Sequence, residues 1–294
     1  MGENHNDEVI SAEPVSNSSE FAKRLISKGI PVNLERAQEV GQMLFDTGAT
    51  SELVGKISNC FRFIGKREFD EDVKKLAKQI SEDFSGKPYN LILFGRRKKS
   101  SDWLLDQLKP YNVLKPTSKL NVDQLWGNLH KLKRPSIFID EWSLSGEQIS
   151  GVAEHIQGAA EYGESGSGLG FRPEVHSYML YAQSGARKVI EESGARTHVI
   201  SQEPITNLFD ITTPNEREIL RKVKIDQRGW KQDVHVRPTT TLTFGWWKIP
   251  DSFYELFINP SPLGLINIED FYPPYKDKSL LTKASPNGRL ITPF

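Results

Sequence analysis

The chain has 294 residues, enough for one large domain or two modest domains with a sizeable hydrophobic core. Its Lys+Arg and Asp+Glu counts are both 38, so the net charge is zero and no general attraction to nucleic acid is expected. Cys60 is the only cysteine, which excludes an internal disulfide and a zinc site built from several cysteines. The sequence has no run of 18 apolar residues and no signal-like apolar segment near its start, so we expect a cytoplasmic protein that contacts no membrane.

The first part of the chain predicts a tail followed by helices. Residues 1–19 are rich in Asn, Ser, Asp and Glu and nearly free of large apolar groups, as is typical of a disordered tail. Helical periodicity continues over residues 20–85, which we expect to form a helical subdomain. No catalytic constellation lies within it. We interpret it as an accessory unit, a cap over a site or a surface that binds a protein partner.

Local signals mark the helices of this subdomain. Asn33 is placed as the N-cap of a helix over residues 34–45, and Ser51 as the cap of a segment that reaches Phe63. A further helix is indicated by apolar residues spaced three and four apart. These residues are Phe69, Val73, Leu76, Ala77 and Ile80.

Strands and helices alternate after a Ser-Gly-Lys-Pro break at residues 85–88. The expected strands cover residues 89–95, 111–114, 137–139, 176–182 and 197–201. The expected helices cover residues 102–109, 122–132 and 185–194, together with the segment that carries Ile149, Val152, Ala153 and Ile156. This alternation predicts βαβ units and a mainly parallel sheet of five or more strands, so residues 86–201 are expected to form an α/β core.

The core is organised around residues 136–148, SIFIDEWSLSGEQ. Residues 137–139 are apolar on both faces, as suits a strand in the centre of a parallel sheet. Asp140 and Glu141 then follow at the carboxyl end of the strand, where open α/β sheets bind ligands. The turn over residues 143–146 would place backbone N–H groups and a helix N-terminus around a phosphate. A plain strand–turn–helix connection with a Ser145-x-x-Gln148 capping box explains the same residues, and both interpretations stay open here.

This stretch resembles the phosphoribosyl-diphosphate (PRPP) loop of type I phosphoribosyltransferases. Its DEWSLSG form is most similar to a divergent branch, PRTase-CE, which is predicted to supply effectors of bacterial conflict systems. The resemblance covers residues 89–201. It implies the type I phosphoribosyltransferase fold, with Asp140 and Glu141 as catalytic acids that hold the ribose hydroxyls and can reach a metal through water and the ligand. The 5′-phosphate would be held by Ser143, Leu144, Ser145, Gly146, Glu147 and Gln148.

Four consecutive cations follow the expected strand 89–95. They are Arg96, Arg97, Lys98 and Lys99. Because the carboxyl ends of parallel strands meet at one edge of a sheet, these cations can approach the turn over residues 143–146. The resemblance implies that they bind the pyrophosphate of PRPP. Taken alone, the run also fits a solvated basic loop.

Two segments of the core depart from a familiar pattern. The loop over residues 163–170 is rich in glycine but lacks the lysine of a nucleotide P-loop, and is interpreted as a linker or a mobile lid. The resembled enzymes usually carry a flexible hairpin before the PRPP strand, whereas a helix over residues 122–132 is expected here. Since that hairpin shields the reaction from water, its replacement weakens the expectation of ordinary turnover.

The sequence changes character over residues 202–294, which are rich in proline and aromatic residues and are expected to form an extension or hood over the sheet. Residues 239–248 predict a strand with Leu242, Phe244 and Trp246 on one core-facing side. A base-binding group is also predicted in this region. It consists of Trp247, Lys248, Asp251 and Phe253.

These residues predict a phosphoribosyltransferase-like glycosyltransferase that acts on PRPP, or a related ribose phosphate or nucleotide, with Mg²⁺ as cofactor. As an effector of an anti-phage or toxin-like system, it would deplete a nucleotide, base or PRPP pool. The alternative is a non-catalytic module that senses PRPP or a nucleotide and regulates a partner protein through the N-terminal helices. We expect contact with nucleic acid only through a partner complex. The sequence does not determine the acceptor base, the partner or the oligomeric state.

Overall fold

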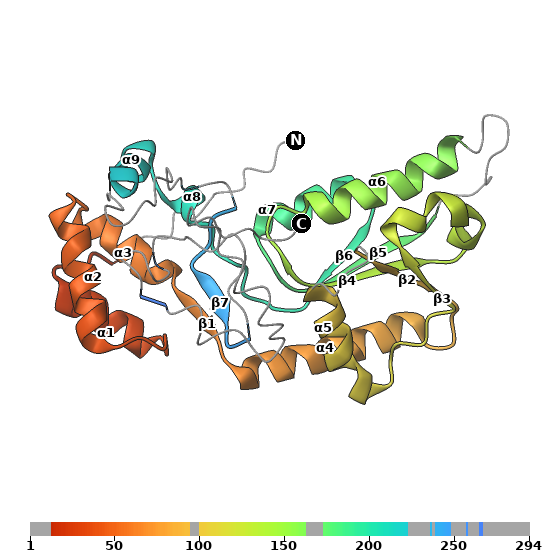
Figure 1. Ribbon diagram of the computed structural model, residues 1–294, viewed down its shortest axis with the longest axis horizontal. Helices are drawn as coiled ribbons and strands as arrows, with labels where there is room; N and C mark the ends of the chain where they lie inside the picture. The colour runs from red at the N-terminus through yellow and green to blue at the C-terminus, as the bar shows by residue number, and fades with distance from the viewer. Residues whose placement is uncertain are drawn as a thin grey trace, which may run out of the picture. The chain divides into compact units, whose positions relative to one another are not determined.

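The computed structural model describes residues 13–94, 100–162, 173–222, 236, 239–247, 257 and 265–266 (Figure 1). The chain divides into two compact units, which are considered separately. Unit 1 combines Met1–Lys66 with Thr206–Phe294, and unit 2 is Arg67–Ile205. None of the helices within the described ranges is long and apolar enough to cross a membrane.

Unit 1 begins with three helices, each started by a polar cap. They are α1 (Ser18–Ser27), α2 (Leu34–Asp46) and α3 (Ser51–Cys60). The predicted cap of α2 is confirmed, because the Asn33 side chain accepts hydrogen bonds from the backbone N–H groups of Glu35 and Arg36. The predicted cap of α3 is wrong by one residue: the Thr50 hydroxyl accepts from the Leu53 N–H at 3.2 Å.

Two further expectations for this region differ from the structure. The helix after residue 51 was expected to reach Phe63, but it ends at Cys60, and Arg62–Ile64 form strand β1. Residues 13–19 were assigned to a disordered tail, yet Val15 is fully buried and its N–H donates to the Ser51 carbonyl at 3.0 Å. One apolar residue in a polar run therefore attaches this segment to α3.

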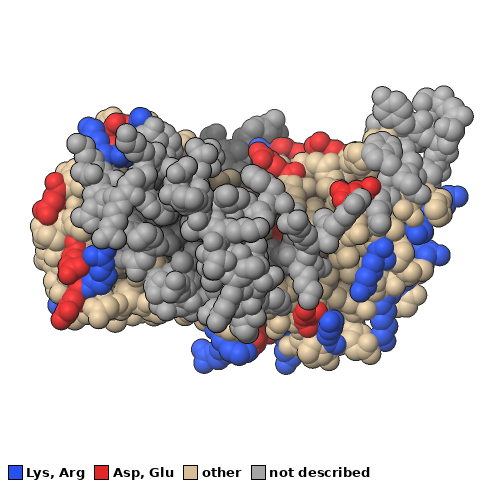
Figure 2. Space-filling view, in the orientation of Figure 1, with Lys and Arg blue, Asp and Glu red and all other residues tan. Residues whose placement is uncertain are grey.

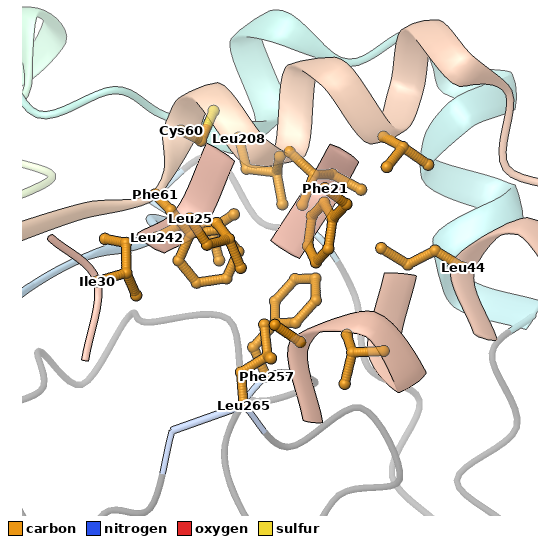
Figure 3. Packing of buried hydrophobic residues seen from close by; sticks show 14 of the residues in the cluster. Phe21, Leu25, Ile30, Leu44, Cys60, Phe61, Leu208, Leu242, Phe257 and Leu265 are labelled. Carbon is orange, nitrogen blue, oxygen red and sulfur yellow. The ribbon is translucent and has the colours of Figure 1, made fainter. Parts of the chain in front are cut away.

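The core of unit 1 combines residues that are far apart in the sequence (Figure 3). Phe21 comes from α1 and Phe61 follows the end of α3, while Leu242 and Phe257 come from the later part of the chain. The rings of Phe61 and Phe257 meet edge to face with centroids 5.1 Å apart. The other elements of the unit are α8 (Leu208–Ile211), α9 (Pro214–Lys222) and β7 (Thr243–Gly245), which pairs with β1 in parallel. The C-terminal region thus shares a core with the N-terminal helices, whereas the sequence predicted two separate regions.

Unit 2 contains a five-stranded sheet in the order β3-β2-β4-β5-β6, with all neighbours parallel. The strands are β2 (Asn90–Leu93), β3 (Ser118–Asn121), β4 (Ser136–Ser143), β5 (Val175–Ala182) and β6 (Arg196–Val199). The central strands are buried on both faces, as their apolar runs predict. The predicted α/β class with a parallel-centred sheet is confirmed.

Helices cover both faces of this sheet, with α6 (Glu147–Tyr162) and α7 (Ser184–Glu192) on one face and α4 (Lys66–Phe84) and α5 (Ser100–Leu108) on the other (Figure 1). The apolar stripe predicted for α4 is confirmed, since all five of its residues are buried. Near its end, α4 contacts the sheet through Asp83 and Phe84, which touch Tyr178 of β5. This contact explains why α4 belongs to unit 2, although the sequence predicted it within the N-terminal helical subdomain.

Two predicted elements between β2 and β4 are wrong. The strand expected at residues 111–114 is absent, because Lys109–Tyr111 form the 3₁₀ turn η1 and Asn112 adopts a left-handed backbone with φ of 51°. The neighbouring strand is instead β3. The helix expected over residues 122–132 is two 3₁₀ segments, η2 (Val122–Gln124) and η3 (Trp126–Lys133), with a non-helical residue at Asn128. Gly127 and Asn128 are poor helix formers, which accounts for the break.

Candidate functional site

The strand order places a topological switch point between β2 and β4. From β2 the chain passes through α5 to β3 on one side, and from β4 it passes through α6 to β5 on the other side. The two helices therefore cover opposite faces of the sheet (Figure 1). In open α/β sheets, ligands bind at this point, in the crevice outside the carboxyl ends of the strands. The end of β4 and the turn after it form the candidate site.

Strand β4 is longer than the sequence predicted. Its pairing with β5 runs from Ser136 to Ser143, whereas its pairing with β2 extends only to Phe138. The expectation that the strand ends before the two acids is wrong, because Asp140 and Glu141 lie inside it. Beyond the end of β2, the strand is held by β5, where the rings of Trp142 and Tyr181 stack with centroids 5.1 Å apart.

The two acids differ in accessibility. Asp140 pairs with Met179 of β5 and is half-buried, whereas Glu141 is only 1% exposed. The alternation of β4 is interrupted between Ser136 and Ser143, because the Ser136 N–H and the Ser143 carbonyl, seven residues apart, both bond on the β5 side. Asp140 is therefore the acid that is more open to a ligand.

Asp140 has a structural task within β4. Its Oδ1 accepts the backbone N–H of Glu141 at 2.8 Å. This bond joins adjacent residues and holds the carboxylate against the backbone of β4. A polar backbone group at the candidate site is thereby satisfied.

A tight turn connects β4 to α6. Gly146 has a φ of +77°, and a Cβ at this position would lie 2.5 Å from the Ala186 carbonyl oxygen of α7. Only glycine fits this conformation and this close approach. The Ser145 hydroxyl accepts the N–H of Glu147 at 3.3 Å, and the Gly146 carbonyl accepts the N–H of Ser150, which starts the helix. The cap bond of Ser145 thus goes to residue 147, whereas the predicted capping box would pair it with Gln148.

The predicted phosphate-binding residues differ in accessibility. Ser143 and Gly146 are buried, Leu144 and Ser145 are half-buried, and Glu147 and Gln148 are exposed. The N-terminus of α6 carries the partial positive charge that favours an anion. Glu147 lies in the first turn of the helix, so its carboxylate already interacts with that dipole and would repel a phosphate. The turn has the shape of an anion site but supplies no cation of its own.

The other predicted site residues lie elsewhere. The pyrophosphate-binding run Arg96, Arg97, Lys98 and Lys99 falls outside the described residues, as do Lys248, Asp251, Phe253 and the loop over residues 163–170. Trp247 belongs to unit 1 and is 2% exposed, so its ring is not open to a base in this conformation. Leu242 and Phe244 lie in the core of unit 1, as predicted.

The arrangement of charged and metal-ligating side chains was compared with what a metal or nucleic acid would need. Within the described ranges, no group of three or more His, Cys, Asp or Glu side chains is placed to hold a metal ion. A magnesium ion at the candidate site would depend on Asp140 together with phosphates of the ligand, as is common for Mg²⁺. On the surface seen in Figure 2, Lys and Arg side chains are interspersed with Asp and Glu, in keeping with a net charge of zero.

A partly buried polar network that the sequence analysis missed joins α4 to β5 and β6. The Tyr178 hydroxyl donates to Asp83 Oδ2 at 2.6 Å, and its ring stacks on His198 with centroids 4.4 Å apart. Nε2 of His198 lies 3.3 Å from Nδ1 of His176, whose Nε2 lies 2.9 Å from Glu174 Oε1. The only signal in the sequence was the alternation of His176 and Tyr178, which share one face of β5.

Burial sets the protonation of this network. It lowers the pKa of His198, and the nearby Asp83 carboxylate only partly opposes the shift. Burial also raises the pKa of Tyr178, reinforced by its hydrogen bond to Asp83. Burial alone would raise the pKa of Asp83, but hydrogen bonds from Tyr178 and Gln79 outweigh it and lower that pKa. The network therefore holds a charged aspartate, a neutral tyrosine and a neutral His198 near pH 7.

Comparison of the chain with protein-family models, curated proteins and solved structures found no match in any of the three. The resemblance to phosphoribosyltransferases therefore remains a prediction from the sequence.

Proposed function

We propose that unit 2 binds PRPP, or a related ribose phosphate or nucleotide, at the carboxyl end of β4 and acts on it as a phosphoribosyltransferase-like enzyme. The observation that carries this proposal is the coincidence of two independent features. The residues that resemble a PRPP loop occupy the strand and turn at the topological switch point of a parallel sheet.

The geometry suggests a division of work between the two acids. Asp140 is accessible and would accept hydrogen bonds from the ribose hydroxyls or hold the magnesium ion. Glu141 is buried and would help to hold β4 in position. The N–H groups at the start of α6 would meet the 5′-phosphate, next to the turn that Gly146 makes possible.

The proposed reaction is loss of pyrophosphate from the anomeric carbon through an oxocarbenium-like state. The negative charge of Asp140 would stabilise the developing positive charge on the sugar. Mg²⁺, when bound, would neutralise charge on the departing pyrophosphate. Arg96, Arg97, Lys98 and Lys99 would contribute to the same task, a role that rests on the sequence. Consumption of PRPP or a nucleotide by this route would suit an effector of phage defence.

A second candidate function is a sensor that binds PRPP or a nucleotide without turnover. Two observations favour it. The segment before β4 consists of 3₁₀ turns and the short strand β3, where the resembled enzymes carry a shielding hairpin. One of the two expected ribose acids is buried. In this case unit 1 would pass the signal to a partner protein.

Titration calorimetry with PRPP and Mg²⁺, followed by an assay of pyrophosphate release, separates these functions. Asp140→Asn keeps the hydrogen bond to the Glu141 N–H but removes the charge. An enzyme should lose at least ~100-fold of its rate, about 2.7 kcal/mol of barrier, while ligand binding changes much less. Asp106→Asn, on the exposed surface of α5, is the matched control and should leave the rate unchanged.

Binding of PRPP without release of pyrophosphate, with every base and nucleoside tried, would establish the sensor. Absence of binding with and without Mg²⁺ would refute both functions. Full activity of the Asp140→Asn protein would refute the role assigned to this carboxylate and leave the ligand to be located elsewhere.

A further inference from the structure

Unit 2 contains a cavity of about 420 Å³ at the end of the sheet opposite to the candidate site. It lies between the last turn of α4, the segment 85–89 that leads into β2, and residues 112–115 after η1. Small-molecule sites usually have volumes of about 300 to 1,000 Å³, so the cavity is large enough for a compact organic ligand. No role has been assigned to it by the proposed function.

The floor of the cavity is apolar and aromatic. Phe84 and Tyr89 both line it, and their rings lie with centroids 5.0 Å apart at an angle of 51°. Ile80 and Val113 add aliphatic side chains to the lining. Such a floor favours a flat apolar body, whose burial removes hydrophobic surface from water.

The rim carries positive charge. Lys87 and Lys115 both line the cavity and are exposed, and none of its lining residues, all of which the structure describes, is acidic. The Lys87 ammonium donates to the Asp83 carbonyl at the end of α4 at 3.0 Å, which holds it at the rim and leaves it further protons to donate. Ser81 and Asn112 supply additional polar groups. The rim therefore favours a negatively charged group on the ligand.

The frame of the cavity is held in place by Tyr89. Its hydroxyl donates to the Val113 carbonyl at 3.4 Å and accepts the Lys115 N–H at 2.9 Å, which ties two walls together. The Thr117 N–H donates to the Tyr89 carbonyl at 2.8 Å. Asn112 has a left-handed backbone, which side-chain-bearing residues rarely adopt. A site that is ordered in advance loses less entropy when a ligand binds.

We propose that this cavity binds a small organic anion with a flat apolar body. The body lies on Phe84 and Tyr89, and the negative group meets Lys87 and Lys115. The proposal does not depend on the function proposed for the carboxyl end of β4, because the two sites lie at opposite ends of β2.

Anilinonaphthalene sulfonate is a suitable probe, because it is an aromatic anion with a flat naphthalene ring and its fluorescence rises in apolar surroundings. The full-length protein is titrated with it at low ionic strength, and labelled methyl groups of Ile80 and Val113 report by NMR whether it occupies the cavity. We expect saturable binding that shifts both methyl signals. Lys115→Met should weaken it about tenfold, equivalent to about 1.4 kcal/mol. The matched control is Lys119→Met, an exposed lysine of β3 that does not line the cavity, and it should bind as the parent does.

N-phenylnaphthylamine, which has a similar aromatic body without the sulfonate, tests the role of charge and should bind much more weakly. Equal affinity for the two probes, an unchanged affinity in Lys115→Met, or binding that leaves both methyl signals in place would overturn the proposal. Once the site is located, displacement of the probe by salicylate, phenyl phosphate or adenosine monophosphate identifies whether carboxylates or phosphates are preferred. Inorganic phosphate alone should not displace it, since it lacks the apolar body.

Discussion

Replacement of Gly146 by alanine tests whether the turn after β4 is held by its contact with α7. The new Cβ would lie 2.5 Å from the Ala186 carbonyl oxygen and 3.1 Å from its Cα, both backbone atoms that cannot rotate away. A left-handed conformation costs a side-chain-bearing residue about 1–2 kcal/mol, and forced overpacking costs about 1–3 kcal/mol. We therefore expect Gly146→Ala to destabilise unit 2 by about 2–5 kcal/mol.

Hydrogen exchange of the β4 and β5 amides measures this effect, because it reports the free energy that opens unit 2. The matched control is Gly151→Ala in α6, where an added Cβ meets no atom within 4 Å. That substitution should stabilise the helix by about 0.8–1 kcal/mol, the opposite sign. A loss below about 1 kcal/mol in Gly146→Ala would refute the packing argument. The large expected cost also means that loss of ligand binding in a Gly146 variant would not by itself locate a phosphate.

Further predictions concern the polar network and the core of unit 1. Burial places the pKa of His198 below its ordinary value of 6.5, so below that pH the unfolded chain binds more protons than the folded chain. The contribution of neutral His198 to the stability of unit 2 is therefore complete above pH 6.5 and is lost as the pH falls further. The lowered pKa of Asp83 adds a second loss below about pH 4. Hydrogen exchange of β5 and β6 amides between pH 8 and pH 5 should reveal the loss of opening free energy that comes from His198. If a His198→Gln protein shows the same dependence of opening free energy on pH, this prediction is wrong. Phe257→Ala should destabilise unit 1 by about 3–5 kcal/mol, measured through the amides of α1 and α3. Unchanged exchange there would show that the C-terminal part does not stabilise this core.

The elements that the sequence predicted correctly are those set by local periodicity. The apolar stripe of α4 needs only the spacing of Phe69, Val73 and Leu76. The cap of α2 needs only Asn33 and the two N–H groups that follow it. The parallel sheet follows from the alternation of apolar strands with helices, since parallel neighbours require crossovers. None of these inferences depends on which distant residues come together.

The errors arose where distant parts of the chain decide the outcome. The core of unit 1 combines residues that lie far apart in the sequence, such as Phe21 and Phe257, and no local pattern predicts that they share one core. The strand expected at residues 111–114 has suitable apolar residues, but the pairing partner of β2 starts at Ser118 instead. Asn112, in its left-handed conformation, turns the chain before that partner begins.

The candidate site shows the same limit in its chemistry. The resemblance implied that Asp140 and Glu141 hold the ribose together. In the structure β5 extends the pairing of β4 to Ser143, and Glu141 is only 1% exposed within that extension. For both acids to hold one ribose, residues 141–143 would have to leave β5, with loss of bonds such as that from the Gln183 N–H to the Ser143 carbonyl at 3.0 Å. Each such bond contributes about 0.5–1.5 kcal/mol, so the ligand would have to supply that free energy on binding. Action through Asp140 alone needs no such change, which is why the single-acid arrangement is the one we propose.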